Sequence, residues 1–392
     1  MKRLFAVISL CLIPALTLAQ NNYHDPEYLK VPSVSTYSQT VTGDLDQDGD
    51  TDLVAFGASV FLFRNLGDGT FETDSSGNTL PERIFQLNIG DGYIQSGALE
   101  DVNGDGVKDI IASTSGQTAG TRNIYLLLNT GAGRFWGPIK LETGLSQSTN
   151  SFSAASVVTA DFNGDGFVDI AAGFSFLGKT VVFLNGGTAG IAPFLPAVTY
   201  DTPVGGAGLS VIRNYPEETL SIISSNQNGP ISNILVGSAD GSFTVEELVV
   251  GSKTRDTASL DLGYYNFMLF TSAERSELLI AVRIANALYG PFPFGANFGA
   301  SIKDVQTTDV DGDQLPDILL SQPWVGTGVD RVIVMTSSQG YAREELTFKD
   351  TYQFCSGDLN GDGKQDIVAG SWNGTSGPIN RDVLGIAFSA SN

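Results

Sequence analysis

The side chains best suited to chemistry in this chain are aspartates that recur in a nine-residue pattern, D-x-[D/N]-x-D-x-x-x-D. The pattern occurs five times and begins at Asp44, Asp101, Asp161, Asp309 and Asp358. Carboxylates at positions 1, 3 and 5 of a tight loop converge on one point, and ligands that are all oxygen suit a hard cation. A divalent ion would also offset the repulsion among these carboxylates. The pattern therefore predicts about five Ca²⁺ sites.

Two alternatives to calcium follow from the same residues. A solvated acidic turn would need no metal, and magnesium would keep several waters and demand stricter octahedral geometry.

Position 6 is glycine in four copies, where a sharp turn favours positive φ: Gly49, Gly106, Gly166 and Gly363. The fourth copy departs from this pattern, with Gln314 in place of glycine. We expect calcium in a structural rather than a catalytic role, because the ion would rigidify a repeated turn.

The spacing of the five copies gives the number of repeats. The third and fourth copies lie about three times farther apart than the others, so two repeats without acidic loops should lie between them. Residues 209–241 and the segment from Thr257 follow the same order of strands and turns. Four strands in about 50 residues, with Asp-Gly hairpin signals, are typical of a propeller blade. The sequence predicts an all-β fold, a seven-bladed β-propeller of four-stranded blades.

The two ends of the chain predict how the ring closes and where the protein goes. The last repeat stops one strand short, so the surplus N-terminal segment, residues 27–37, should supply that strand and remove an exposed edge. Residues 1–19 combine Lys2 and Arg3 with an apolar stretch that ends in Thr17-Leu18-Ala19, which is typical of a signal peptide. We expect residues 20–392 to form a single propeller that is secreted, extracellular or held at the cell surface.

Composition excludes several classes of function. Acidic residues outnumber basic ones by 43 to 21, which argues against a nucleic-acid partner. No later segment approaches the ~20 apolar residues of a transmembrane helix. The single histidine, His24, argues against a Ser-His-Asp triad and a His-based zinc site. After removal of the signal, Cys355 is the one cysteine, and we expect it to be buried. We expect a monomer.

The acidic loop, the apolar strand that follows it (such as IAAG) and the hairpin NLGDGTF together resemble the FG-GAP/VCBS repeat family. That family includes the seven-bladed propeller of integrin α-subunits and many exported bacterial proteins. The resemblance implies Ca²⁺ in the loops that join the first and second strands of a blade. Its members include adhesion proteins, lectins and accessory domains of polysaccharide-degrading enzymes, so several functions stay open.

The resemblance also implies a ligand set for each loop, made of the side chains at positions 1, 3, 5 and 9 and the main-chain carbonyl at position 7. The first two sets are Asp44, Asp46, Asp48, Asp50 and Asp52, and Asp101, Asn103, Asp105, Val107 and Asp109. The third is Asp161, Asn163, Asp165, Phe167 and Asp169. The last two are Asp309, Asp311, Asp313, Leu315 and Asp317, and Asp358, Asn360, Asp362, Lys364 and Asp366.

The face opposite the acidic loops is where propellers commonly meet their ligands. Aromatic residues expected there are Phe174, Phe176, Trp324 and Trp372. Exposed rings would suit stacking on sugars or anchoring a protein partner, and the alternative is that they cover the ends of the blades. The sequence favours a binding or adhesion module for carbohydrate or protein rather than an enzyme. A carbohydrate-active enzyme of the polysaccharide lyase type, or its accessory domain, is the alternative, and a purely structural surface protein is a third possibility.

Overall fold

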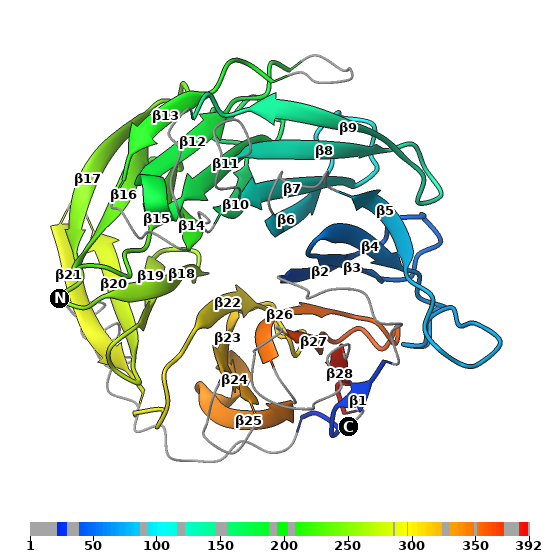
Figure 1. Ribbon diagram of the computed structural model, residues 1–392. Coiled ribbons are helices and arrows are strands. Elements are labelled where there is room, and N and C mark those ends of the chain that lie inside the picture. Colours follow the sequence, from blue (N-terminus) through cyan, green and yellow to red (C-terminus); the bar gives the residue numbers. More distant parts are fainter. Residues whose placement is uncertain are drawn as a thin grey trace.

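In the computed structural model, the described residues form seven four-stranded antiparallel sheets arranged in a ring (Figure 1). The structure describes residues 22–29, 39–86, 93–115, 122–145, 155–187, 194–202, 208–284, 287–295, 297–323, 330–348, 351–371 and 384–390. Each sheet is one blade, and in blades 1 to 6 the strands run in chain order from the inside of the ring to the outside. The prediction of an all-β, seven-bladed propeller is confirmed.

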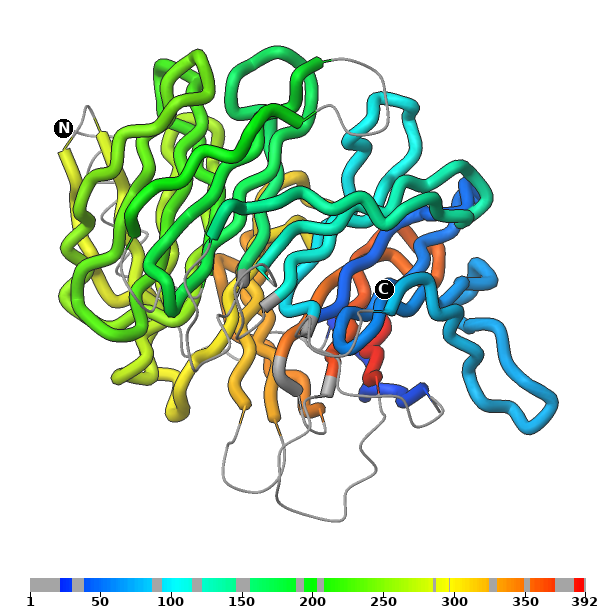
Figure 2. The backbone as a smooth tube through the Cα atoms, turned by 45° about the horizontal axis from the view of Figure 1, so that its top comes forward, coloured from blue at the N-terminus to red at the C-terminus, as the bar shows by residue number. Residues whose placement is uncertain are grey.

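The first three blades carry three of the acidic loops. Blade 1 consists of β2 (Gln39–Gly43), β3 (Asp52–Phe56), β4 (Ser59–Phe63) and β5 (Glu82–Gln86). Blade 2 consists of β6 (Tyr93–Glu100), β7 (Asp109–Ser115), β8 (Asn123–Asn129) and β9 (Phe135–Glu142). Blade 3 consists of β10 (Ala155–Ala160), β11 (Asp169–Phe174), β12 (Lys179–Phe183) and β13 (Val198–Asp201), with the short 3₁₀ helix η1 (Ser175–Leu177). Figure 2 shows the connection from β4 to β5 projecting from the ring.

The next three blades include the two repeats that lack the acidic residues. Blade 4 consists of β14 (Leu209–Arg213), β15 (Leu220–Ser224), β16 (Ile231–Gly237) and β17 (Phe243–Val249). Blade 5 consists of β18 (Thr254–Asp261), β19 (Asn266–Ser272), β20 (Leu278–Ile284) and β21 (Ala287–Phe294). Blade 6 consists of β22 (Asp304–Thr308), β23 (Asp317–Gln322), β24 (Asp330–Thr336) and β25 (Ala342–Phe348), with the 3₁₀ helix η2 (Ser337–Gln339).

Blade 7 joins the two ends of the chain. It consists of β26 (Thr351–Gly357), β27 (Asp366–Ser371), β28 (Gly385–Ala387) and the N-terminal strand β1 (Glu27–Tyr28). Glu27 pairs with Ile386, and Tyr28 pairs with Gly385. Ring closure by an N-terminal strand is therefore confirmed, and the closure covers an edge that would otherwise expose unpaired backbone groups.

Apolar strands build the core between neighbouring blades. All five residues of β3 and of β4 are buried, whereas most residues of the outer strand β9 are exposed. Blade contacts are close: the ring of Phe56 in blade 1 lies against Gly97 of blade 2, where a Cβ atom would come within 2.2 Å of it. Gly97 is therefore required by packing. Cys355 is buried as expected, and its thiol donates to Thr40 Oγ1 at 3.2 Å.

Within the described ranges, no helix has the length and apolar character needed to cross a bilayer.

Candidate metal centre

All five acidic loops join the first strand of a blade to the second, so they lie at the same face of the ring. We call them loop 1 (44–52), loop 2 (101–109), loop 3 (161–169), loop 6 (309–317) and loop 7 (358–366), after their blades. Each loop is folded by its own side chains. In loop 2, Asp101 accepts the N–H groups of Gly104 and Gly106, both at 2.7 Å. Asn103 Oδ1 accepts the N–H of Asp105 at 2.9 Å.

Loop 6 keeps this turn despite its glutamine at position 6. Gln314 has φ of 67°, in the left-handed region, and its N–H donates to Asp309 Oδ2 at 2.8 Å. Glycine at the same position of loop 2, Gly106, has φ of 86° and makes the equivalent bond. The substitution therefore leaves the loop geometry intact, at the cost of some backbone strain.

The aspartate at position 9 fastens each loop to its blade. Asp109 is fully buried, with Oδ2 accepting the N–H of Val102 at 3.0 Å and Oδ1 accepting the N–H of Asn129 at 2.7 Å. Burial, with smaller contributions from the carboxylates of Asp105 and Asp101, raises its pKa to about 6 although the two hydrogen bonds act to lower it. Burial likewise raises the pKa of the equivalent aspartates to about 6 in Asp52, Asp169 and Asp317, and raises that of Asp366.

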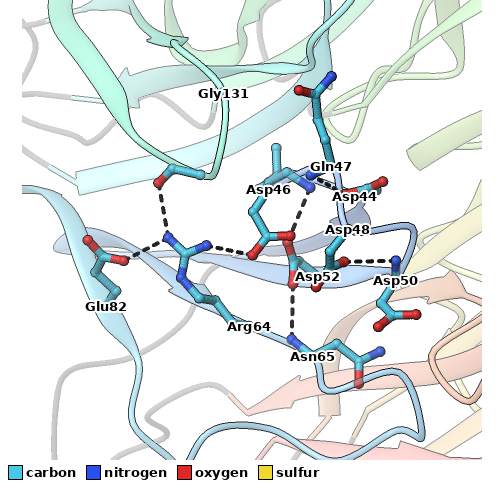
Figure 3. Close-up of polar contacts among 12 residues, drawn as sticks. Asp44, Asp46, Gln47, Asp48, Asp50, Asp52, Arg64, Asn65, Glu82 and Gly131 are labelled. Carbon is cyan, nitrogen blue, oxygen red and sulfur yellow. Dashed lines mark hydrogen bonds and ion pairs between the residues drawn. The ribbon is translucent and has the colours of Figure 1, made fainter.

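Loop 1 brings three carboxylates together. Oxygens of Asp44, Asp46 and Asp48 all lie within 4.8 Å of one another, as the sequence predicted for positions 1, 3 and 5. Asp46 Oδ2 accepts a hydrogen bond from Arg64 at 2.8 Å (Figure 3), whereas the buried Asp46 Oδ1 has no hydrogen-bond partner among the residues that the structure describes. A buried carboxylate oxygen without a partner beside two further carboxylates is the arrangement that a bound cation would satisfy. The residues of loop 1 therefore fit a metal ion.

Loop 6 converges in a different combination. Its close group is Asp309, Asp311 and Asp317, at positions 1, 3 and 9. Asp313 at position 5 accepts hydrogen bonds from Leu315 N–H at 2.8 Å and Ser337 Oγ at 2.9 Å. Loops 2, 3 and 7 have asparagine at position 3 and supply three carboxylates each.

A row of asparagines that the sequence analysis did not single out links one loop to the next. Asn129, at the end of β8, donates through Nδ2 to the carbonyl of Leu45 in loop 1 at 2.7 Å and to that of Lys108 in its own loop at 3.1 Å. Asn185 bonds Val102 of loop 2 at 2.9 Å, and Asn65 bonds Leu359 of loop 7 at 2.7 Å. The signal was present in the sequence, because an Asn-x-Gly follows the third strand of blades 1 to 3.

The two blades without acidic loops use an ion-pair network at the same face. Arg213 in blade 4 pairs with Glu218 at 3.0 Å and lies 3.9 Å from Asp261 in blade 5. The hydroxyl of Tyr215 also bonds Asp261 at 2.9 Å. A guanidinium therefore supplies positive charge where the other blades have converging carboxylates.

The aromatic residues expected on the opposite face differ in their exposure to solvent. Phe174, the last residue of β11, is 1% exposed and packs in the apolar core between blades 2 and 3. The prediction that its ring is exposed for stacking on a ligand is therefore wrong. Phe176, in the turn after β11, is 46% exposed and is available at that face. Trp324 and Trp372 lie outside the described residues.

A pair of acids outside the loops bears on the enzyme alternative. Asp256 of blade 5 hydrogen-bonds Asp304 of blade 6, and its Oδ2 accepts the N–H of Val305 at 3.0 Å. Asp256 also packs against Gly208, where a Cβ atom would lie 1.9 Å from its Oδ1. Removal from water, together with the Asp304 charge, raises the pKa of Asp256 well above its ordinary value. This pair lies where blades 4, 5 and 6 meet, with Asp304 buried and Asp256 partly exposed.

Comparisons with known proteins agree with this architecture. The FG-GAP-like repeat matches residues 44–112 and 101–172, and the FG-GAP repeat matches residues 351–378. Among solved structures, BBS1N in complex with ARL6DN, soaked with mercury, has a TM-score of 0.59 and 10% identity over 95% of this chain and 98% of that chain. An Agrocybe aegerita lectin that recognises non-reducing terminal N-acetylglucosamine has a TM-score of 0.49 and 15% identity over 83% and 86%. No curated protein matches the chain.

Proposed function

Because the chain is an FG-GAP-type seven-bladed β-propeller, we propose that it is a calcium-stabilised recognition module of an exported protein, which binds carbohydrate or a protein partner. The observation that carries the calcium part is the unpartnered buried oxygen of Asp46 beside Asp44 and Asp48. The five loops share one hydrogen-bonded turn at one face of the ring, and each supplies three or four carboxylates.

The residues that would hold calcium are those at positions 1, 3 and 5, together with the position 7 carbonyl and the position 9 carboxylate. A bound ion would supply positive charge to a loop whose carboxylates otherwise repel one another. The position 9 oxygens already accept backbone N–H groups, yet a carboxylate has about four acceptor sites, so ligation by the remaining lone pairs is open to them. The chain's own residues shape and orient each loop.

Recognition is favoured over catalysis because the acidic residues have structural partners. The loop aspartates accept backbone N–H groups, and Asp256 is held between blades by Asp304 and by the N–H of Val305. His24, the single histidine of the chain, is exposed on the N-terminal segment. The proposed partner face is the one that carries Phe176, opposite the acidic loops. Export rests on the signal-like residues 1–19.

The test has two parts. Thermal unfolding in Ca²⁺ and in EDTA measures the metal contribution, and an equal melting temperature in both would contradict it. A glycan array and a protein capture experiment, each with Ca²⁺ and with EDTA, measure recognition. Binding of any captured ligand should be weaker in the variants Phe176→Ala, Trp324→Ala and Trp372→Ala. Unchanged binding by all three variants would show that the ligand does not bind at the opposite face.

A further inference from the structure

A pocket of about 370 Å³ lies on the loop face, between loop 6 and the end of blade 7. Its walls come from the N-terminal segment at Tyr23, from Asp311 and Asp313 of loop 6, from Thr336 at the end of β24, and from Lys364 of loop 7. The volume falls at the lower end of the range of small-molecule sites, roughly 300–1,000 Å³. It suits a ligand the size of one ring.

Thr336 provides a hydroxyl that the protein itself does not use. The residue is 2% exposed and lines the pocket, and its Oγ1 has no hydrogen-bond partner among the described residues. Its neighbours Ser337 and Ser338 both donate their hydroxyls to loop 6 carboxylates. A buried hydroxyl without a partner costs free energy unless something in the pocket bonds it.

Lys364 provides a positive charge that no carboxylate neutralises. Its side chain is half-buried, and its ammonium donates to the carbonyl of Ala390 at 3.2 Å. Lys364 forms no salt bridge with any residue that the structure describes, although acids outnumber bases by 43 to 21 in the chain. An ammonium has three donors, so two remain for a ligand.

We propose that this pocket binds a hydroxylated carboxylate of one-ring size, a uronic acid unit, with its carboxylate on Lys364 and a ring hydroxyl on Thr336. Gln339 and Asn22 add amide groups to the lining, which can bond further hydroxyls. The apolar wall is the ring of Tyr23 together with Val310.

The inference rests on the proposed calcium occupancy of loop 6. Without a cation, Asp311 and Asp313 would repel an anionic ligand, and a divalent ion in the loop would reverse that effect. A neutral sugar would leave the charge of Lys364 without a partner. Binding is therefore expected to require both calcium and the ligand carboxylate.

Isothermal titration calorimetry on the full chain tests the pocket with two matched probes, D-galacturonate and D-galactose. In Ca²⁺, galacturonate should bind at least about tenfold tighter than galactose, and EDTA should abolish its binding. Equal binding of the two sugars, no binding of galacturonate, or binding that persists in EDTA would each overturn the inference. Titration with oligogalacturonate tests whether the ligand is a free uronic acid or the end of a polysaccharide. If it is the end of a polysaccharide, oligogalacturonate should bind at least as tightly as the free acid.

Two variants test the residues. Lys364→Met should lower the affinity for galacturonate by about tenfold. The control Lys253→Met should leave it unchanged, because Lys253 precedes β18 at the end away from the loop face. Thr336→Val removes the unpartnered hydroxyl without changing the side-chain shape, so it should weaken ligand binding without lowering the melting temperature of the free protein. Full galacturonate affinity in both variants would contradict the assignment. A calcium-dependent melting temperature with no uronate binding would sink this inference and leave the proposed function standing.

Discussion

The side-chain amide of Asn129 donates to the carbonyl of Leu45 at 2.7 Å, and this bond connects blade 2 to the acidic loop of blade 1. The N–H of Leu45 in turn donates to Asp52, and Asp52 accepts the N–H of Asn65. Asn65 reaches Leu359 of loop 7 across the ring closure. Loops 7, 1, 2 and 3 are thus joined by hydrogen bonds that pass through each position 9 aspartate. The loops proposed to bind calcium therefore share residues with the contacts between blades.

Asn129→Ala should destabilise the protein by about 2–3 kcal/mol, because it removes two side-chain donors and leaves the carbonyls of Leu45 and Lys108 without them. Urea unfolding measures the free energy of unfolding. Asn78→Ala is the matched control, since Asn78 bonds Asp74 within a projecting hairpin and should cost less than about 1 kcal/mol. Equal losses in the two variants would argue against the inter-blade role.

Asp161→Asn should remove one calcium ion from loop 3. The carboxylate accepts the N–H groups of Gly164 and Gly166, and the amide would keep one acceptor and lose the charge. A site filled at about a hundred times its Kd contributes about 2.7 kcal/mol, so that loss should appear in Ca²⁺ and largely disappear in EDTA. Plasma emission spectrometry counts the bound ions.

The control for this variant is Asp201→Asn, an exposed aspartate on β13 that pairs with Lys179. It should retain the full ion count and the full calcium dependence of unfolding. An unchanged ion count in Asp161→Asn would show that loop 3 does not hold calcium.

The sequence predicted the blades and the loops because both depend on local, repeated patterns. Asp44, Asp46 and Asp48 converge because their spacing within one tight turn brings them together whatever surrounds them. The position of the Phe174 ring could not be predicted from a local pattern. Phe174 ends a strand next to an exposed turn, and packing between blades 2 and 3 decides that its ring is buried.

Contacts between residues that are distant in the sequence could not be predicted from it either. Arg64 bonds Asp46 within its blade (Figure 3) but also the carbonyl of Gly133 in the next blade, and no local pattern encodes that second pairing. The pocket at Thr336 depends on Tyr23, from the opposite end of the chain. Sites formed by ring closure therefore appear only once the ring is assembled.

Tyr215→Phe should destabilise the protein by about 1 kcal/mol, equally in Ca²⁺ and in EDTA. The hydroxyl bonds the Asp261 carboxylate at 2.9 Å, and partial burial and this bond raise the pKa of Tyr215 to about 12. Because blades 4 and 5 use Arg213 rather than converging aspartates at this face, the loss should not depend on metal. Tyr264→Phe, at an 81% exposed position, is the control and should change nothing measurable. A loss confined to Ca²⁺ would mean that this network acts through the metal loops.

Asp256→Asn should stabilise the protein at neutral pH by on the order of 1–2 kcal/mol. The folded protein raises the pKa of Asp256 through removal from water and the charge of Asp304, so the folded state holds the proton more tightly than the unfolded chain does. As pH rises above the unfolded pKa of about 3.9, the unfolded chain loses this proton first, and wild-type stability falls. Asparagine cannot ionise, can still accept from Val305 N–H, and can donate to Asp304.

The advantage of Asp256→Asn should therefore be small near pH 4, grow as pH rises, and level off above the folded pKa. The groups that face this site are Asp304, Lys303 and Arg255, and they are the same in both proteins. Urea unfolding from pH 4.5 to 8 in EDTA measures the difference. Asp68→Asn is the control: Thr70 lowers the pKa of that exposed carboxylate, so its substitution should give no stabilisation at any pH. A constant difference between Asp256→Asn and wild type across this range would show that Asp256 is ionised in the folded protein throughout.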